Sequence, residues 1–192
     1  MMEQEHQTHT PAMSADEIFG LFVRYGRNKA PHILYDLDEQ GLVSEQDFPR
    51  LLATAYTMCE YPTDYLDIEV WVAWFGRVGF RDSEGKPIER PTEKMVLYRG
   101  ALPENRHSLS WTIDREQAQW FANRIPGAKV YRLEASPNQL LADYRGGGRG
   151  EAEMVVRPYE LGGWNVTQVG EGVPGGEESE MVSHMAWLSN RA

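Results

Sequence analysis

The sequence predicts an α+β protein in which a helical N-terminal portion precedes a region of short strands. Apolar residues recur with a helical period up to about residue 80, and short alternating apolar runs dominate after residue 92. A polar stretch with glycine and proline, residues 81–91, separates them and is typical of a linker or long loop. We expect residues 14–80 to pack with residues 92–192 as one compact unit, because the helical portion carries apolar surface that needs a partner.

The first helix is expected to begin at Ser14 and to end near Arg27. Ser14 and Glu17 have the spacing of a capping box, and apolar side chains follow at helical intervals. The preceding residues, 1–13, are polar without any period, and we expect a disordered tail there. Two histidines in this tail lie three apart, but without a helix they give no metal site.

Two more helices are expected before residue 80. One begins between residues 44 and 47, since Pro49 is tolerated only in a first turn. The other lies in the apolar stretch 65–80, which also alternates like a strand. Its length and the glycine near its end, Gly79, favour a buried helix.

The second half is expected to contain strands, one helix and a C-terminal loop. The helix begins at Asp114, which has capping-box spacing to Gln117. Residues 170–180 are rich in glycine and acid and predict a flexible loop, and residues 181–188 predict a short terminal helix. The expected strands are residues 95–98, 130–135, 153–157 and 164–169.

Composition excludes several classes of protein. The 192 residues include 29 acidic and 19 basic side chains, a net charge of −10, with 41% hydrophobic and 25% charged residues. This is an ordinary globular balance, and no apolar run resembles a membrane span or a signal peptide. A single cysteine, Cys59, excludes an internal disulfide framework and a cysteine-based zinc site. The acidic balance disfavours nucleic acid as a partner, and we expect a cytoplasmic protein or one delivered without a signal peptide.

Three polar clusters lie on the predicted strands of the second half. An arginine and a glycine end the first strand, a serine and a threonine lead into the Asp114 helix, and two glutamates begin a later strand. The residues concerned are Tyr98, Arg99 and Gly100, then Ser110 and Thr112, then Glu151 and Glu153.

Each cluster also has a purely structural explanation. Arg99 fits an ordinary strand end, the two hydroxyl residues fit an exposed strand face around a buried Trp111, and the glutamates fit a solvated strand face. The strand period nevertheless puts Glu151 and Glu153 on one side, about 6–7 Å apart. Two neighbouring carboxylates are costly unless they are solvated or used.

The order of the three clusters resembles the Arg-Ser-Glu signature of the mono-ADP-ribosyltransferases, which include the binary clostridial toxin enzymes and the arginine-specific transferases. The matching segments are LYRG (97–100), SWT (110–112) and EAEMVVRP (151–158). Residues 95–169 are also similar to small bacterial or phage-type members of this superfamily, in which LYRGA, LSWT, WFA and a late Glu-x-Glu recur. One departure is the bulky Trp111, where the family's middle motif is usually Ser-Thr-Ser.

The resemblance implies a split β-sheet core and NAD as the substrate, with no metal. Arg99 would anchor a phosphate or ribose oxygen through its planar donor fork. Ser110 would bind ribose, and Thr112 would support that geometry. Tyr98 and Trp111 are aromatic neighbours that either stack on the nicotinamide or adenine ring or pack in the core.

The resemblance assigns the chemical step to the two glutamates. Cleavage of the nicotinamide–ribose bond passes through an oxocarbenium-like state, as glycoside cleavage does. Glu153 would contact the ribose 2′-hydroxyl and stabilise the developing positive charge. Glu151 would position or deprotonate the acceptor, and a glutamate there goes with arginine acceptors in the family.

A glycine-rich segment precedes the glutamates and would form the loop that meets the acceptor. Phosphate binding by this segment is the alternative, although it lacks the GxGxxG pattern and a following helix. His107 precedes the middle motif and could reach the site, but a loop histidine is more often solvated. The loop residues are Arg145, Gly146, Gly147, Gly148 and Arg149.

The expected function is therefore that of an NAD-dependent mono-ADP-ribosyltransferase with a macromolecular acceptor, expected to be a protein. The alternatives are an NAD glycohydrolase that uses water, and a non-catalytic interaction protein with a degenerate transferase core. The helical portion would recognise the target, bind an immunity or antitoxin partner, or cover the sheet. Arginines in the motifs allow an acidic protein to present a basic site to NAD, and the net charge favours a basic acceptor surface.

Overall fold

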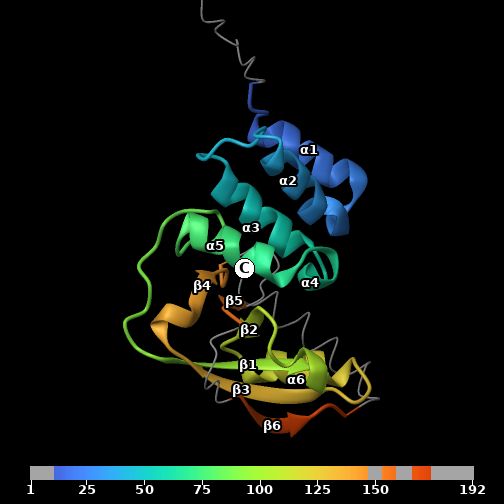
Figure 1. Ribbon diagram of the computed structural model, residues 1–192. Coiled ribbons are helices and arrows are strands. Elements are labelled where there is room, and N and C mark those ends of the chain that lie inside the picture. Colours follow the sequence, from blue (N-terminus) through green and yellow to red (C-terminus); the bar gives the residue numbers. More distant parts are fainter. Residues whose placement is uncertain (1–10, 147–152, 159–165, 174–192) are drawn as a thin grey trace, which may run out of the picture. The chain divides into compact units, whose positions relative to one another are not determined.

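The computed structural model describes residues 11–146, 153–158 and 166–173 (Figure 1). The protein is α+β, with helices between residues 15 and 78 followed by an antiparallel sheet of six strands. The chain forms two compact units, residues 1–66 and 67–192. The boundary precedes the helix observed at 68–78, in the stretch where the sequence predicts a helix (65–80), so that helix belongs to the same unit as the sheet.

The helical unit contains four helices among its described residues. They are α1 (Ala15–Tyr25), α2 (Ala30–Glu39), α3 (Phe48–Met58) and α4 (Pro62–Tyr65). The predicted capping box of α1 is confirmed: Glu17 N donates to Ser14 Oγ at 3.3 Å, and Ser14 N donates to Glu17 Oε2 at 2.9 Å. The predicted start of α3 is also confirmed, with proline in its first turn.

Two features of this unit were not predicted. Helix α2 has no side-chain cap at its N-terminus and follows a short 3₁₀ turn at Arg27–Lys29, so its start signal is the proline in its first turn, Pro31. The end of the predicted tail is ordered, since Met13 N donates to Leu42 O at 2.8 Å. The rest of that tail up to residue 10, with its two histidines, lies outside the described residues.

The second unit begins with α5 (Ile68–Val78), which ends at Gly79 as predicted. The sheet order is β4-β5-β2-β1-β3-β6, and each of these described strands is antiparallel to its neighbours. The strands are β1 (Met95–Ala101), β2 (Ser110–Thr112), β3 (Lys129–Ala135), β4 (Leu140–Asp143), β5 (Glu153–Val156) and β6 (Thr167–Glu171). Helix α6 (Arg115–Asn123) connects β2 to β3 and begins after Asp114, as predicted.

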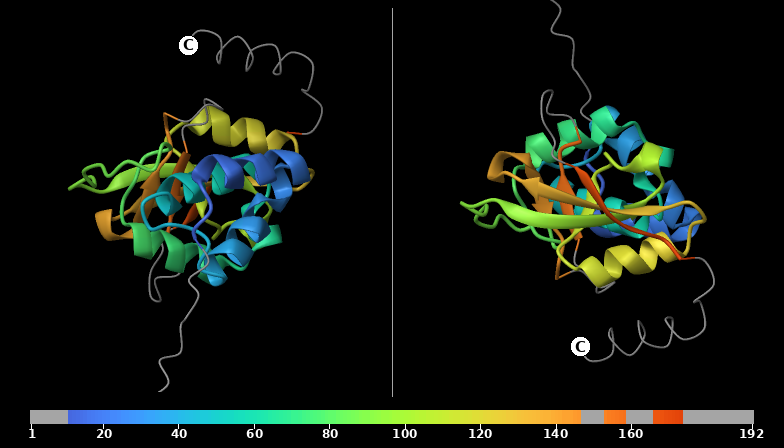
Figure 2. Two further views of the ribbon diagram at one scale, coloured as in Figure 1. Left: turned by 90° about the horizontal axis from the view of Figure 1, so that it is seen from above. Right: turned by 90° about the horizontal axis from the view of Figure 1, so that it is seen from below.

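The sheet consists of two halves that meet at one place. Within the described residues, β1 and β2 pair only at Tyr98 and Thr112, whereas β1 and β3 pair over seven residues. We call β4-β5-β2 the first half-sheet and β1-β3-β6 the second half-sheet. Figure 2 shows the strands β4 and β5 running across the direction of β1 and β3.

The core lies on both faces of the second half-sheet. Tyr131, Leu133 and Ala135 are buried on one face of β3, which confirms the predicted alternation. Val130 lies on the opposite face against α6. One cluster joins the two half-sheets: Leu97, Tyr131, Leu133 and Ala135 from the second, and Trp111, Leu140, Met154 and Val156 from the first, together with Phe80.

The strand predictions need several corrections. Strand β4 was not expected, because its four residues LLAD are nearly all buried and do not alternate. Gly170 and Glu171 were predicted in a loop but belong to β6, where they pair with β3. Strand β5 is confirmed. Residues 159–165 and 174–192, including the predicted terminal helix, lie outside the described residues.

No helix in the described ranges is long and apolar enough to cross a membrane.

Candidate active site

The three polar clusters of the sequence lie on three neighbouring strands, β1, β2 and β5. Arg99 is near the end of β1, Ser110 begins β2, and Glu153 begins β5. The fold therefore brings Glu153 to the junction of the two half-sheets, beside strands whose polar residues Ser110 and Arg99 lie 43 and 54 positions earlier in the sequence.

The strand register puts Thr112 between Tyr98 and Glu153. Thr112 pairs with Tyr98 of β1 on one side and with Glu153 of β5 on the other. Residues directly opposite on antiparallel strands share a face, with Cβ atoms about 4.5–5.5 Å apart. Ser110 is two residues from Thr112 on β2, so it shares this face and is a diagonal neighbour of Glu153.

Arg99 reaches the junction from the other face of the sheet. Arg99 directly follows Tyr98 on β1, so the two side chains point to opposite faces of the sheet. The partner of Arg99 on β3 is the buried Tyr131. Its Nη1 donates to Ser110 O at 2.5 Å and its Nε donates to Asn105 O at 3.0 Å. The guanidinium thus fixes the β1–β2 connection and touches the middle motif through its main chain.

Thr112 uses its hydroxyl to hold the start of α6. The hydroxyl donates to Gln117 Oε1 at 2.8 Å and accepts from Asp114 N at 3.0 Å, and both Thr112 and Gln117 are buried. Asp114 in turn caps the helix by accepting from the backbone N–H groups of Glu116 and Gln117. Thr112 is therefore buried and supports the geometry of the site, whereas Ser110 is half-buried.

Gly100 is required by the packing of α6 on the second half-sheet. A Cβ atom at this position would lie 2.0 Å from Ala118 O and 2.6 Å from Ala122 N. The half-buried Tyr98 packs in the same layer, against the cluster that contains Ala118 and Ala122. The LYRG segment thus combines one polar residue at the junction with two residues that seat the helix.

Glu153 lies between Thr112 on one side and Tyr144 on the other. Tyr144 directly follows β4, and its N–H donates to Glu153 O at 2.8 Å. Burial raises the pKa of Tyr144 well above its ordinary value, and the charges of Glu153 and then Asp82 raise it further. Tyr144 carried no sequence signal, because only the register of β4 against β5 reveals it.

Only part of the predicted acceptor loop lies in the described residues. Arg145 donates from Nε to Asp143 Oδ1 at 2.8 Å and from Nη2 to Asp143 Oδ2 at 2.5 Å. This hydrogen bonding raises the pKa of the Arg145 guanidinium, which is fixed to the end of β4. Gly146 is exposed. Gly147, Gly148, Arg149 and the second glutamate, Glu151, lie outside the described residues.

The two remaining candidates are Trp111 and His107. Trp111 is buried in the cluster that joins the half-sheets, and its Nε1 donates to Ser108 O at 2.9 Å. Core packing is therefore the interpretation that the structure favours for Trp111. Partial burial, and then the charge of Arg106, lower the pKa of His107, so its imidazole is neutral near pH 7.

Among the described residues, no group of three or more histidine, cysteine, aspartate or glutamate side chains could hold a metal ion. No protein-family model, curated protein or solved structure matches the chain. The interpretation of the site therefore depends on its own residues and on the order of its motifs.

Proposed function

We propose that the protein is an NAD-dependent mono-ADP-ribosyltransferase whose active site lies at the junction of the two half-sheets. The observation that supports this most strongly is that Arg99, Ser110 and Glu153 lie on three adjacent strands, where Arg99 donates to the Ser110 carbonyl and Ser110 shares a face with Glu153. These are the residues that the motif resemblance singles out, and nothing in their sequence spacing requires them to meet.

The sheet itself agrees with the split core that the resemblance implies. Two three-stranded halves share a single described pair, Tyr98 with Thr112, and enclose a common apolar cluster. A separation of the strands on either side of this pair is what a dinucleotide would need in order to approach β1 and β2 together. We therefore infer an ADP-ribosyltransferase-like split sheet.

The residue chemistry fits NAD. The dinucleotide carries an anionic pyrophosphate, and Arg99 supplies a permanent positive charge with a planar set of donors. Two of these donors hold backbone carbonyls, which keeps the guanidinium oriented. Ser110 is half-buried on the neighbouring strand and has a hydroxyl that can bind a ribose oxygen.

In the proposed reaction the bond between C1′ of the ribose and the nicotinamide nitrogen breaks, and nicotinamide leaves with the bonding electron pair. Positive charge develops on the ribose, where the Glu153 carboxylate stabilises it through the 2′-hydroxyl. A nucleophile of the acceptor then attacks C1′ and gives its proton to a base. By the motif, Glu151 positions this nucleophile or takes its proton.

Glu153→Gln tests the proposal. This variant keeps the size of the side chain and removes its charge, so nicotinamide release from NAD should fall by about 100-fold or more. Glu134→Gln is the matched control, because Glu134 is a strand glutamate on the exposed surface of β3. It should retain full activity. No nicotinamide release by the wild type, with or without cell lysate, would contradict the proposal.

A second measurement separates transfer from hydrolysis. With labelled NAD, a transferase leaves labelled ADP-ribose on a lysate protein or on a small arginine analogue. Glu151→Ala should keep most of the nicotinamide release and lose this transfer. Nicotinamide release without any transfer by the wild type would assign the site to an NAD glycohydrolase instead.

A further inference from the structure

Tyr144 occupies a special position beside the proposed catalytic glutamate. The pairing of β4 with β5 continues from Asp143 and Met154 to Tyr144 and Glu153, and the Tyr144 N–H donates to Glu153 O at 2.8 Å. Directly opposite residues of an antiparallel pair project their side chains from the same face. The phenol and the carboxylate are therefore neighbours on the face that also carries Thr112.

The phenol ring is fixed in place. Tyr144 is only 2% exposed, and its ring lies against Phe75 of α5 with a centroid distance of 6.2 Å. A buried tyrosine hydroxyl needs a hydrogen-bond partner, because an unpaired polar group in the core is costly.

Two carboxylates, those of Glu153 and Asp82, act electrostatically on the phenol. Asp82 is occupied with its own turn, since its Oδ1 accepts from Glu84 N at 2.9 Å and from Lys86 N at 2.8 Å. Glu153 lies directly opposite Tyr144 in the pairing of β4 with β5. Burial and both charges keep the phenol protonated, so its O–H remains a donor at physiological pH.

We infer that Tyr144 is a positioning residue that orients the Glu153 carboxylate, an assignment that rests on the function proposed above. A neutral phenol that donates to the carboxylate holds it ionised and directs its remaining lone pairs away from β4. The carboxylate is then preorganised for the ribose 2′-hydroxyl, with Thr112 limiting its movement on the other side. Tyr144 itself need not touch NAD.

Tyr144→Phe tests this inference, because it removes the hydroxyl and keeps the buried ring. We expect kcat for nicotinamide release to fall about 10-fold with the KM for NAD changed less than about twofold. The pKa of Glu153, followed by NMR of its labelled carboxyl carbon, should rise, since a hydrogen bond to the charged form is lost. Tyr56→Phe is the control: it removes the same atom from a tyrosine that is 1% exposed in the helical unit. It should change neither quantity.

A measurement without a change at Tyr144 covers the case in which the variant folds poorly. The NMR signal of the Tyr144 ring in the otherwise intact chain should shift as Glu153 titrates, and Glu153→Gln should abolish that shift. An unchanged kcat and an unchanged Glu153 titration in Tyr144→Phe would overturn the inference. A Tyr144 NMR signal that does not shift as Glu153 titrates would overturn it as well. If the wild type releases no nicotinamide, the proposed function is wrong, while the two titrations still decide whether Tyr144 controls Glu153.

Discussion

The two half-sheets differ in the length of their strands and in the kind of residue they carry. In the second half-sheet, β1 and β3 pair over seven residues, and α6 covers one face closely. In the first half-sheet the strands are three or four residues long. Each half-sheet contains one irregular pairing, β4 with β5 in the first and β3 with β6 in the second. The polar candidates Ser110, Thr112 and Glu153 belong to the first half-sheet, and Arg145 follows β4. Arg99 belongs to the second half-sheet.

This difference indicates separate roles: the second half-sheet stabilises the fold, and the first carries most of the polar residues of the candidate site. A long, fully paired ladder covered by a helix can bury apolar surface on both faces, as Leu133 and Val130 show. In short strands the polar side chains lie close to the strand ends. They are therefore at the edge of the paired region, where they can contact a ligand. The single described pair of Tyr98 with Thr112 then connects the second half-sheet to the first half-sheet, which carries Glu153.

The largest expected effect on stability comes from the close approach of α6 to the second half-sheet. Gly100→Ala puts a Cβ atom 2.0 Å from a helix carbonyl that cannot move alone. We expect a loss of about 3 kcal/mol or more, or failure to fold, in urea denaturation. The control is Gly76→Ala in α5, where a Cβ meets nothing within 4 Å. It should gain up to about 1 kcal/mol, and equal effects of the two changes would refute this account.

The next effect concerns the hydroxyl that links the first half-sheet to α6. Thr112→Val keeps the shape and leaves Gln117 Oε1 and Asp114 N without their partner, at a cost of about 1–3 kcal/mol. Thr167→Val changes an exposed threonine of β6 and should stay within about 0.5 kcal/mol. The two unfolding free energies measure this, and a neutral Thr112→Val would mean that α6 does not need this cap.

A pH-dependent effect is expected at Tyr144. Its pKa is raised in the folded state, so the folded protein keeps a proton that the unfolded chain loses above about pH 10. Stability from this group is complete below that pH and declines above it, by about 1 kcal/mol per pH unit. Tyr144→Phe should lack this contribution, so the difference in unfolding free energy between wild type and variant should shrink between pH 9 and 11. A difference in unfolding free energy that stays constant over this pH range would contradict the prediction.

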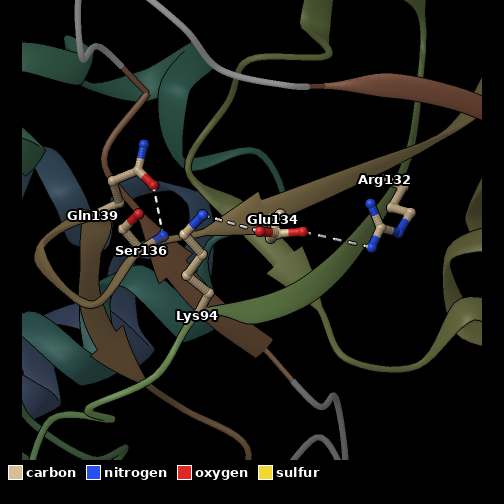
Figure 3. A network of polar contacts seen from close by, with 5 residues as sticks. All are labelled: Lys94, Arg132, Glu134, Ser136 and Gln139. Atoms are coloured by element: carbon tan, nitrogen blue, oxygen red, sulfur yellow. Dashed lines mark hydrogen bonds and ion pairs between the residues drawn. The ribbon is translucent and has the colours of Figure 1, made fainter.

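The smallest effect is expected on the outer surface of the second half-sheet, shown in Figure 3. Glu134 contacts Lys94 at 3.1 Å and Arg132 at 4.0 Å, but its side chain is 43% exposed. Glu134→Ala should therefore change the free energy of unfolding by less than about 1 kcal/mol.

Figure 3 also supplies the comparison for that variant. Gln139 is 8% exposed, and its Oε1 accepts from Ser136 N at 2.7 Å in a capping box. Gln139→Ala should cost about 1–2 kcal/mol, more than Glu134→Ala, because the part-buried Ser136 N–H loses its acceptor. The reverse order in thermal or urea unfolding would show that the exposed ion pairs matter more than burial.

Local signals predicted the helices that have them. Ser14 with Glu17 marked α1, Asp114 with Gln117 marked α6, and the long apolar run before Gly79 marked α5. Helix α2 lacks a capping side chain, and the proline in its first turn, Pro31, was not used to predict its start. The buried β4 has no alternation because both of its faces are covered, and a period of two appears only where one face is polar.

The sequence by itself determined the α+β class, the capped helices, and the order of an arginine, two hydroxyls and a glutamate along the second half. These are local properties, since a cap or an alternating run acts over a few residues. Only the tertiary structure decided that Thr112 faces Glu153, that Arg99 holds the carbonyl of Ser110, and that Tyr144 lies beside the glutamate. The physical reason is register: a shift of one residue would turn each strand over and separate these side chains, and only the packed core fixes it.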